Sequence, residues 1–450
     1  MGEKFSREEW ETCLRVLNIL KTNPFENPDN QQFKTLITSI AKQAKKLNKR
    51  ELLLEKKAKD HSVLKSTSIV FNALNKTSNF SYGESLISDL QDLEIERRCY
   101  CCNEIYTKLH FYYHKLCPSC ADYNYQQRNK KYDFSNYNVI ITGGRVKIGY
   151  ATVLKFLRAN ANVILTSRFP ALALKQLSNE SDYEQWSSNI NVYGLDLRNL
   201  KAVQKFIDYC NNEIKCLDIL VNNAAQTIKY PTTYYRSLIA KENNLLLKSK
   251  SANLHQNNTP LASHGNQLPC NLDENEIHLN RFGQPVDFRD KNSWNSNLTE
   301  IEIEELLEVN LINHIAPFQL ISGLKNLMLK SDNKERFIIN VTSSEGQFSY
   351  PNKNAFHPHT NMTKAALNML TRTSAQDFIN DSIFMNAVDV GWISTGVAEV
   401  KREKQFNDLK IPPLDPLDGA MRIIHPIDEI LNGQKSLYGV LLKNYKIVDW

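Results

Sequence analysis

The spacing of apolar residues changes about a third of the way along the chain. Near the amino terminus, Trp10, Leu14 and Leu17 recur at helical spacing behind Ser6 and Glu9, a pair with the pattern of a capping box. A second helical pattern starts near residue 29 and runs into a stretch rich in lysine. These periods predict a helical N-terminal region over residues 1–95.

From residue 132 onward, short β-branched runs alternate with longer helical patterns, which start near 148 and then cover about 200–212, 300–328 and 361–380. This alternation is typical of βαβ units. It predicts an α/β fold over residues 132–450, with a single Rossmann-like parallel sheet and helices on both faces. The predicted strands are VIIT (139–142), NVILTS (162–167), NVYGLDL (191–197), LDILVNNA (217–224), RFIINVTS (336–343) and IFMNAVDV (383–390).

The alternation is interrupted between Tyr230 and about Leu298. The 60 residues from Lys241 to Glu300 include 12 asparagines and show little periodicity. Such composition favours solvated chain over packed core. We therefore expect a polar surface insertion at about residues 231–300, disordered in part.

The charge of the chain is uneven. Its net charge is +6, yet residues 132–450 hold equal numbers of basic and acidic side chains, so the excess lies in residues 1–131. Acidic residues interleave with the lysines of the second helix, which favours a solvated helix face over a nucleic-acid site. No apolar run is long enough to cross a bilayer, and the first residues lack an apolar signal core. We expect a cytoplasmic protein with no membrane span.

Five of the nine cysteines lie within 22 residues. Cys99 and Cys102 form one CxxC pair, and Cys117 and Cys120 form a second pair after 14 intervening residues. This spacing predicts a structural zinc ion held by four thiolates in a small ribbon at residues 96–131. Two alternatives stay open: Cys101 replaces Cys99, or one of two nearby histidines, His110 and His114, replaces a thiolate instead of packing beside the metal.

A run of motifs follows the ribbon in a fixed order. Strand VIIT leads into TGGRVKIG (142–149), where an α/β sheet can cradle a pyrophosphate on backbone N–H groups and a helix N-terminus. The motifs GLDL, NNAA, EVNL, NVTSSEG, NMTKAAL and NAVDVGWIST come next. This succession resembles the short-chain dehydrogenase/reductase family from residue 136 to about 396. The resemblance implies a Rossmann-like domain that binds NAD(P)(H) and acts on a carbonyl or alcohol.

The resemblance also assigns roles in cofactor binding. The residues are Thr142, Gly143, Ile148 and Gly149 in the turn, Asp196 and Leu197 at the adenine, Asn222 and Ala224 beside the cofactor, Lys364 at the nicotinamide ribose, and Gly391 after the last predicted strand. Arg168 ends the second strand, where no carboxylate is present to accept a ribose hydroxyl. A cation at this point favours a 2′-phosphate, so we expect NADP, with NAD as the alternative.

Two departures from the family pattern bear on chemistry. Lys147 replaces the middle glycine of the turn, so its side chain must either swing clear or meet the phosphates as a charge, to which Arg145 adds. Thr360 stands four residues before Lys364, where the family has a tyrosine that passes a proton. An aliphatic hydroxyl is too weak an acid to do this by itself.

Several residues remain as candidates for the reaction. His359 can relay a proton, although a displacement of one helical residue turns its side chain by about 100°. Tyr350 offers a phenol from the preceding loop, and a third possibility is that no relay exists. The resemblance implies that Asn310 supports Lys364 through water and that Ser343 orients the substrate oxygen.

Two functions therefore stay open. The first is an NAD(P)(H)-dependent oxidoreductase with a small-molecule carbonyl or alcohol substrate. The second is a catalytically impaired sensor or scaffold that keeps the dinucleotide site. The cysteine segment, the HPHTNMTKAALNMLTRTSA stretch and the carboxyl end LYGVLLKNYKIVDW resemble a zinc-ribbon-bearing subgroup of the family. The family commonly forms dimers or tetramers, so a homo-oligomer is possible here.

Overall fold

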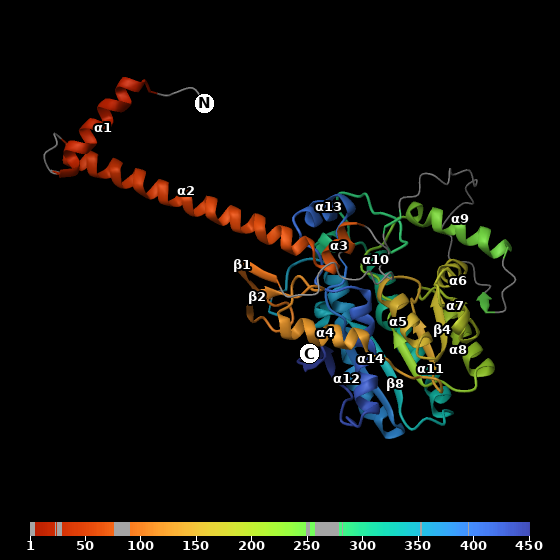
Figure 1. Ribbon diagram of the computed structural model, residues 1–450. Helices are drawn as coiled ribbons and strands as arrows, with labels where there is room; N and C mark the ends of the chain where they lie inside the picture. The colour runs from red at the N-terminus through yellow and green to blue at the C-terminus, as the bar shows by residue number, and fades with distance from the viewer. Residues whose placement is uncertain are drawn as a thin grey trace. The chain divides into compact units, whose positions relative to one another are not determined.

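The computed structural model describes residues 5–22, 24, 29–75, 91–248, 253–256, 279–280, 282–351, 353–394 and 396–450 (Figure 1). The chain divides into two compact units. One consists of Met1–Val63 with Leu93–Ile95, and the other of Leu64–Asp92 with Glu96–Trp450. Within the described ranges, no helix is both long enough and apolar enough to span a membrane.

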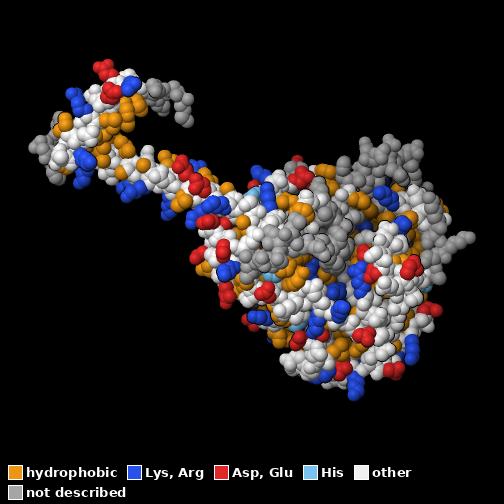
Figure 2. Space-filling view, viewed as in Figure 1, with side chains coloured by type: hydrophobic (Ala, Val, Ile, Leu, Met, Phe, Trp, Pro, Cys, Tyr) orange, Lys and Arg blue, Asp and Glu red, His pale blue; other side chains and the backbone are white. Residues whose placement is uncertain are grey.

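The described residues of the Met1–Val63 part of the first unit are mainly helical, as predicted, whereas Leu93–Ile95 belong to a strand. Helix α1 covers Arg7–Thr22, and helix α2 begins at Asn30 and ends at Lys65. The capping box forms, because Ser6 Oγ accepts a hydrogen bond from Glu9 N–H while Ser6 N–H donates to the Glu9 carboxylate. Apolar side chains that include Trp10 and Ile19 remain exposed along α1 (Figure 2).

The cysteine segment lies in the second unit together with a short helix, α3 (Ser68–Leu74). Strand β1 (Gln91–Arg98) pairs antiparallel with β2 (Ile105–Leu109), and helix α4 covers Pro118–Asn129. The predicted boundary at residue 95 therefore falls inside a strand. Helix α3 joins this segment through hydrogen bonds from Ser68 N–H and Ile69 N–H to the carbonyls of Phe111 and Tyr112.

A nine-stranded sheet forms the centre of the second unit and confirms the predicted α/β class. Its order is β11-β10-β9-β8-β6-β3-β4-β5-β7, and every pair is parallel except β10 with β11. All six predicted strands are present. The strands are β3 (Asn138–Thr142), β4 (Asn162–Ser167), β5 (Ile190–Gly194), β6 (Ile219–Asn222), β7 (Leu254–Gln256), β8 (Arg336–Thr342), β9 (Ile383–Asp389), β10 (Leu441–Lys443) and β11 (Lys446–Val448).

Helices cover both faces of this sheet (Figure 1). Helices α8, α11 and the end of α12 bury their apolar side chains against β3, β6, β8 and β9 in one core. Helices α5 and α14 pack against each other and contact the sheet as a second layer. The helices are α5 (Lys147–Leu157), α6 (Pro170–Leu177), α7 (Tyr183–Trp186), α8 (Leu200–Glu213), α9 (Thr232–Lys248), α10 (Ile303–Asn310), α11 (Ala316–Leu329), α12 (Pro358–Phe378), α13 (Glu399–Asn407) and α14 (Pro416–Leu431).

The insertion at 231–300 is more regular, in its described part, than its composition predicts. It contains α9, whose buried Glu242 accepts hydrogen bonds from Ala171 N–H and Leu172 N–H at the start of α6. It also supplies β7, which extends the sheet beside β5. Tertiary contacts therefore order segments that show no periodicity of their own. The predicted disorder concerns residues 249–252, 257–278 and 281, which lie outside the described residues.

Candidate dinucleotide site and metal centre

The turn after β3 brings the chain back on itself at its glycines. Gly143 has φ +68°, a conformation that a side chain disfavours. A Cβ at Gly149 would lie 2.3 Å from the Gly143 carbonyl oxygen, so only glycine fits this position. The start of α5 can thus approach a ligand with its backbone N–H groups, which is the geometry that binds a phosphate.

Thr142 ties the turn to the neighbouring strand. Its hydroxyl oxygen accepts hydrogen bonds from the backbone N–H groups of Asn223 and Ala224, and each donor–acceptor distance is 3.0 Å. The Asn223 side chain donates to the carbonyls of Thr142 and Gly143. Asn223 thus fixes the turn, a role that sequence analysis did not assign although the residue stands in the NNAA motif.

Lys147 adopts the conformation of the glycine that it replaces. Its φ is +51°, and its ammonium lies 5.2 Å from the ring centroid of Phe282 in the insertion. Beside it opens a cavity of about 460 Å³, which Ser394, Phe288 and Phe406 also line. Sequence analysis left open whether the Lys147 side chain points away from the turn or toward a bound phosphate. This geometry favours a side chain that points away from the turn. The cavity joins the turn to the segment that follows β9.

Two arginines flank one aromatic ring at the end of β4. The guanidinium carbons of Arg145 and Arg168 lie 5.5 Å and 5.9 Å from the ring centroid of Phe169. Burial, followed by the charge of Arg168, lowers the pKa of Arg145 to about 10. Among the described residues, neither arginine has a carboxylate within 4.0 Å. The nearby acid Glu242 is engaged with backbone N–H groups at the start of α6.

The predicted adenine residues lie beyond β5. Asp196 forms a bidentate ion pair with Arg198, with a shortest distance of 2.6 Å. Burial opposes ionisation of Asp196, but the hydrogen bonds and charge of Arg198 outweigh it and lower the pKa. The Leu197 side chain belongs to the buried core. Its backbone is therefore the part that can face a ligand.

Asn222 and Ala224 occupy different surroundings. The Asn222 side chain is buried in the sheet, where its Nδ2 donates to Asn340 Oδ1 over 2.8 Å. Asn340 in turn donates to Thr371 on α12, so this amide chain links two strands and a helix. Ala224 packs against Gly143, because a Cβ added there would lie 3.0 Å from Ala224. Of the two, Ala224 is the one at the turn.

Lys364 is buried on α12 behind the end of β8. Its ammonium donates to the Val341 carbonyl over 2.8 Å, and burial lowers its pKa to about 8. A Cβ at Gly346 would lie 2.6 Å from the Lys364 carbonyl carbon, so the loop after β8 approaches α12 closely. These contacts fix the lysine at the carboxyl edge of the sheet.

Ser343 and Ser344 differ in their partners. The Ser343 hydroxyl is half-buried and forms no hydrogen bond with another described residue. The Ser344 hydroxyl donates to Asp389 over 2.8 Å and accepts from the Lys443 ammonium. Of these two hydroxyls, Ser343 is therefore the one without a partner among the described residues.

Thr360 and His359 both lie in the first turn of α12, which begins at Pro358 rather than near 361. The Thr360 hydroxyl is buried and has no hydrogen-bond partner among the described residues. His359 Nε2 lies 2.8 Å from the Thr227 carbonyl, while its Nδ1 is buried without a partner. Since helical residues four apart share a face, Thr360 lies on the side of Lys364 and His359 is turned away.

Tyr350 lies in an exposed loop. Its ring has the ammonium of Lys443 at 4.9 Å and that of Lys353 at 5.9 Å. The exposed fraction of Tyr350 is 38%, so its phenol faces solvent and these lysines. None of these contacts places the Tyr350 hydroxyl near Lys364.

The two asparagines of EVNLIN have separate positions. Asn310 donates to the Leu306 carbonyl within its own helix. Asn313 lies in the π-helical turn Leu311–Ile315, where it exchanges two hydrogen bonds with the Gln226 backbone and donates to Thr363 beside Lys364. Asn313, which sequence analysis missed, is therefore the asparagine that links α12 to the end of β6. Its only signal in the sequence is a second Asn three residues after the first.

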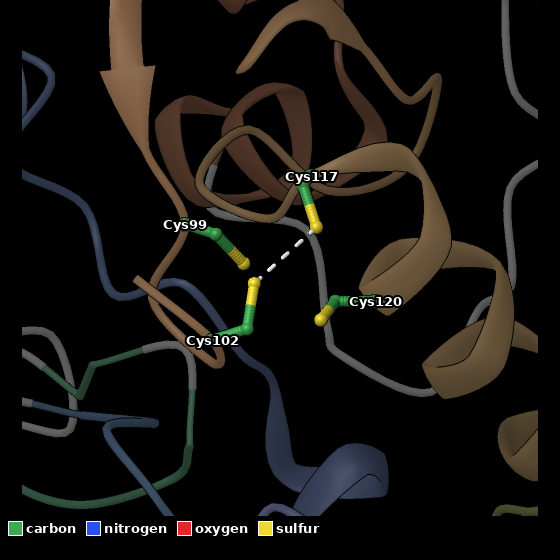
Figure 3. Close-up of side chains that lie close together, drawn as sticks. All are labelled: Cys99, Cys102, Cys117 and Cys120. Atoms are coloured by element: carbon green, nitrogen blue, oxygen red, sulfur yellow. Dashed lines mark hydrogen bonds between the residues drawn. The ribbon is translucent and has the colours of Figure 1, made fainter. Parts of the chain in front are cut away.

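The four predicted cysteines meet at one point (Figure 3). The sulfurs of Cys99, Cys102, Cys117 and Cys120 all lie within 4.8 Å of one another, and the Cys102 and Cys117 sulfurs are 3.6 Å apart. Four thiols at such distances can surround one tetrahedral metal ion. Cys101 lies outside the set.

The two histidines of the segment are used elsewhere. His110 accepts a hydrogen bond at Nδ1 from the Tyr112 N–H, and His114 Nε2 lies 3.2 Å from the Ile411 carbonyl. Both rings are buried. Neither ring belongs to the group of four sulfurs, so the four cysteines form the predicted ligand set without a histidine.

Two family models match the second unit. One, described as short chain dehydrogenase, matches residues 137–238, and another, described as Enoyl-(Acyl carrier protein) reductase, matches residues 288–411. The uncharacterized protein R665 of Acanthamoeba polyphaga mimivirus is 32% identical over 354 residues, which cover 74% of this chain and 71% of that protein. The chloroplastic chlorophyll(ide) b reductase NOL of Oryza sativa subsp. japonica is 37% identical over 90 residues, 20% of this chain and 25% of that one.

Solved structures with a similar fold include two proteins of modest likeness. A short-chain dehydrogenase/reductase of unknown function from Caenorhabditis elegans, with cofactor, is 19% identical at a TM-score of 0.46, covering 68% of this chain and 92% of that chain. The NADPH-bound carbonyl reductase from chicken fatty liver is 17% identical at a TM-score of 0.43, covering 70% and 98%.

Proposed function

Because this chain belongs to the short-chain dehydrogenase/reductase family, we propose that it is an NADPH-dependent oxidoreductase that reduces a carbonyl compound. The observation that carries the choice of cofactor is the pair Arg145 and Arg168, whose guanidinium carbons lie 5.5 Å and 5.9 Å from the ring centroid of Phe169. These two close cations have no carboxylate within 4.0 Å among the described residues and repel each other, which adds to burial in lowering the pKa of Arg145. A 2′-phosphate between them removes that repulsion and satisfies both charges.

The glycine turn fits the diphosphate of such a cofactor. Gly143 and Gly149 let the turn pack closely on itself and on Ala224, and Thr142 and Asn223 hold the turn in that shape. Ile148 and the segment around Gly391 complete the site with Lys364 at the ribose, as the family pattern implies. When bound, NADPH supplies the hydride.

The protein must supply the proton without the usual tyrosine. We assign this step to Lys364, whose pKa of about 8 lets the ammonium act as an acid near neutral pH. Among the described residues, the hydroxyls of Thr360 and Ser343 have no hydrogen-bond partner, and they are suited to hydrogen-bond the substrate oxygen. His359 then serves to fix the start of α12 through the Thr227 carbonyl.

The four-cysteine centre is proposed to bind zinc for structure. Four protein ligands leave no open position for water or substrate. Tyr112, Tyr113 and Arg128 join the segment to Asp415 and Asp418 next to and within α14. The metal thus stabilises a part that is packed on the catalytic domain.

Cofactor choice is tested by calorimetric titration of the full chain with NADPH and with NADH. Arg168→Gln should raise the Kd for NADPH about 10- to 100-fold, because it removes one charge-assisted hydrogen bond to the 2′-phosphate. The Kd for NADH should stay the same, because NADH lacks this phosphate. Arg236→Gln removes an exposed arginine from α9 and serves as the matched control. Equal weakening by both variants, or equal losses for both nucleotides, would refute the choice of NADPH.

Catalysis is tested separately by NADPH consumption with a panel of aldehydes and ketones. Thr360→Val keeps the shape of the side chain and should lower kcat about tenfold while the Kd for NADPH stays the same. If the wild-type chain binds NADPH and consumes none with any carbonyl, the enzyme proposal fails. The replacement of tyrosine by Thr360 would then mark a dinucleotide sensor.

A further inference from the structure

Tyr100 stands between two clustered cysteines and reaches the loop that follows β9. Its hydroxyl oxygen accepts a hydrogen bond from Trp392 N–H over 2.8 Å. Gly391 has φ +85°, and a Cβ there would lie 3.3 Å from the Tyr100 hydroxyl and 2.7 Å from Leu414. The turn from Cys99 to Cys102 therefore touches the loop backbone directly.

A second contact holds the far end of this connection between β9 and α14, which includes helix α13 and is called the loop below. The Lys115 ammonium donates to the Ile411 carbonyl over 2.6 Å and lies 4.5 Å from the ring centroid of Trp392. Tyr100 N–H donates to the Lys115 carbonyl. Tyr100 and Lys115 thus form one unit of the cysteine segment that contacts the loop at residues 392 and 411.

The loop in turn contacts the phosphate-binding turn. Ile393 is buried, and an ideal Cβ at Gly419 would lie 2.6 Å from Ile393 Cδ1 and 3.0 Å from Ile148 Cγ1. Both isoleucines therefore converge on one glycine of α14. A continuous series of contacts runs from the cysteine turn through the loop to Ile148 at the start of α5.

We propose that Tyr100 is a positioning residue that couples metal binding at the four cysteines to dinucleotide binding at the turn. Metal–sulfur bonds fix the Cys99–Cys102 turn, the turn fixes Tyr100, and Tyr100 fixes the backbone at Trp392. When this acceptor is lost, the loop populates other conformations, and only the competent fraction binds the nucleotide. The coupling rests on the proposed function for the identity of the nucleotide.

The test uses Tyr100→Phe in the full, metal-loaded chain. This change keeps the ring and removes only the hydroxyl, so the Kd for NADPH should rise about fivefold, the effect of one neutral hydrogen bond. Tyr106→Phe is the matched control, because that hydroxyl donates to the His114 carbonyl within the segment and does not touch the loop. Metal content, measured on both variants, should equal that of the wild type.

A second readout needs no nucleotide. Hydrogen exchange of the Trp392 amide should be slow in the metal-loaded wild type and at least several-fold faster in Tyr100→Phe, with Tyr106→Phe unchanged. If the wild type binds no NADPH, the proposed function fails and this exchange result alone decides the positioning role. An exchange rate or a Kd for NADPH that is the same in Tyr100→Phe as in the wild type would overturn the coupling.

Discussion

Arg128 provides the sharpest stability prediction, since it lies buried where the cysteine segment meets α14. Its guanidinium donates to Asp415 over 2.7 and 2.8 Å and to Asp418 over 3.2 Å. Burial alone would raise the pKa of both carboxyls, and at Asp415 the charge and hydrogen bonds of Arg128 outweigh burial and lower it. The three groups therefore depend on one another for their charged states.

Arg128→Met keeps the length of the side chain and removes its charge. Asp415 then loses its ion-pair partner and Asp418 keeps the charge of Arg422, and breaking such a buried pair costs about 3–5 kcal/mol. The pKa of Asp418 is already raised in the wild type by burial and by the charge of Asp415. Without Arg128 the pKa of Asp418 rises further and that of Asp415 rises too, so the protonated forms are favoured in the native protein. The loss of stability is therefore complete above the raised pKa values and shrinks as the pH falls through them.

The free energy of unfolding of Arg128→Met and of the wild type should be measured with urea at about pH 8 and about pH 6, by far-ultraviolet circular dichroism. Arg158→Met is the control, because Arg158 also pairs with two carboxylates, Glu180 and Asp182, but is 31% exposed. Pairs of that kind contribute at most about 1 kcal/mol. A loss at Arg128 that is no larger than at Arg158, or that grows as the pH falls, would refute the reasoning.

Three further predictions concern the site and the metal. Gly149→Ala should reduce the affinity for NADPH by at least about 100-fold in calorimetry, since its Cβ would lie 2.3 Å from the Gly143 carbonyl oxygen. Gly433→Ala strains its own backbone at φ +108° but has no atom within 4 Å, so it should leave the affinity for NADPH unchanged. The kcat/KM for carbonyl reduction should fall above about pH 8 as Lys364 loses its proton; a profile flat to about pH 10 would exclude this lysine as the acid. Cys117→Ser should lose metal in elemental analysis and have a lower Tm than the wild type. Cys101→Ser, outside the four-sulfur set, should keep the metal content and the Tm of the wild type.

The parts of the fold that could be predicted are those whose structure is determined by residues close together in the sequence. The six strands with continuous β-branched runs were predicted, because buried parallel strands carry their apolar pattern in every residue. Strands β7, β10 and β11 were missed, since each has three residues and owes its form to a neighbouring strand. Helix α12 begins earlier than predicted because Pro358 starts it, with Trp294 of the insertion stacked on His357 before it.

The same distinction holds for the site. The glycine turn and the four cysteines were predicted from spacing, which directly limits where backbone and sulfur atoms can lie. Asn313 could not be separated from Asn310, because both stand in one helical pattern and only the contact with Gln226 distinguishes them. Tyr100 gave no signal either, since its partner Trp392 is almost 300 residues away in the chain.

The pairing of β7 with β5 limits how far this chain can be shortened. Val192 N–H donates to the Asn253 carbonyl, and β7 follows β5 in register from Val192 to Gly194. If the asparagine-rich stretch were deleted, β5 would become an exposed edge strand of the sheet. Its unpaired backbone N–H and C=O groups could then pair with a strand of another molecule. A shortened variant that is to remain free of aggregation should therefore retain residues 253–256, with deletions made at other positions.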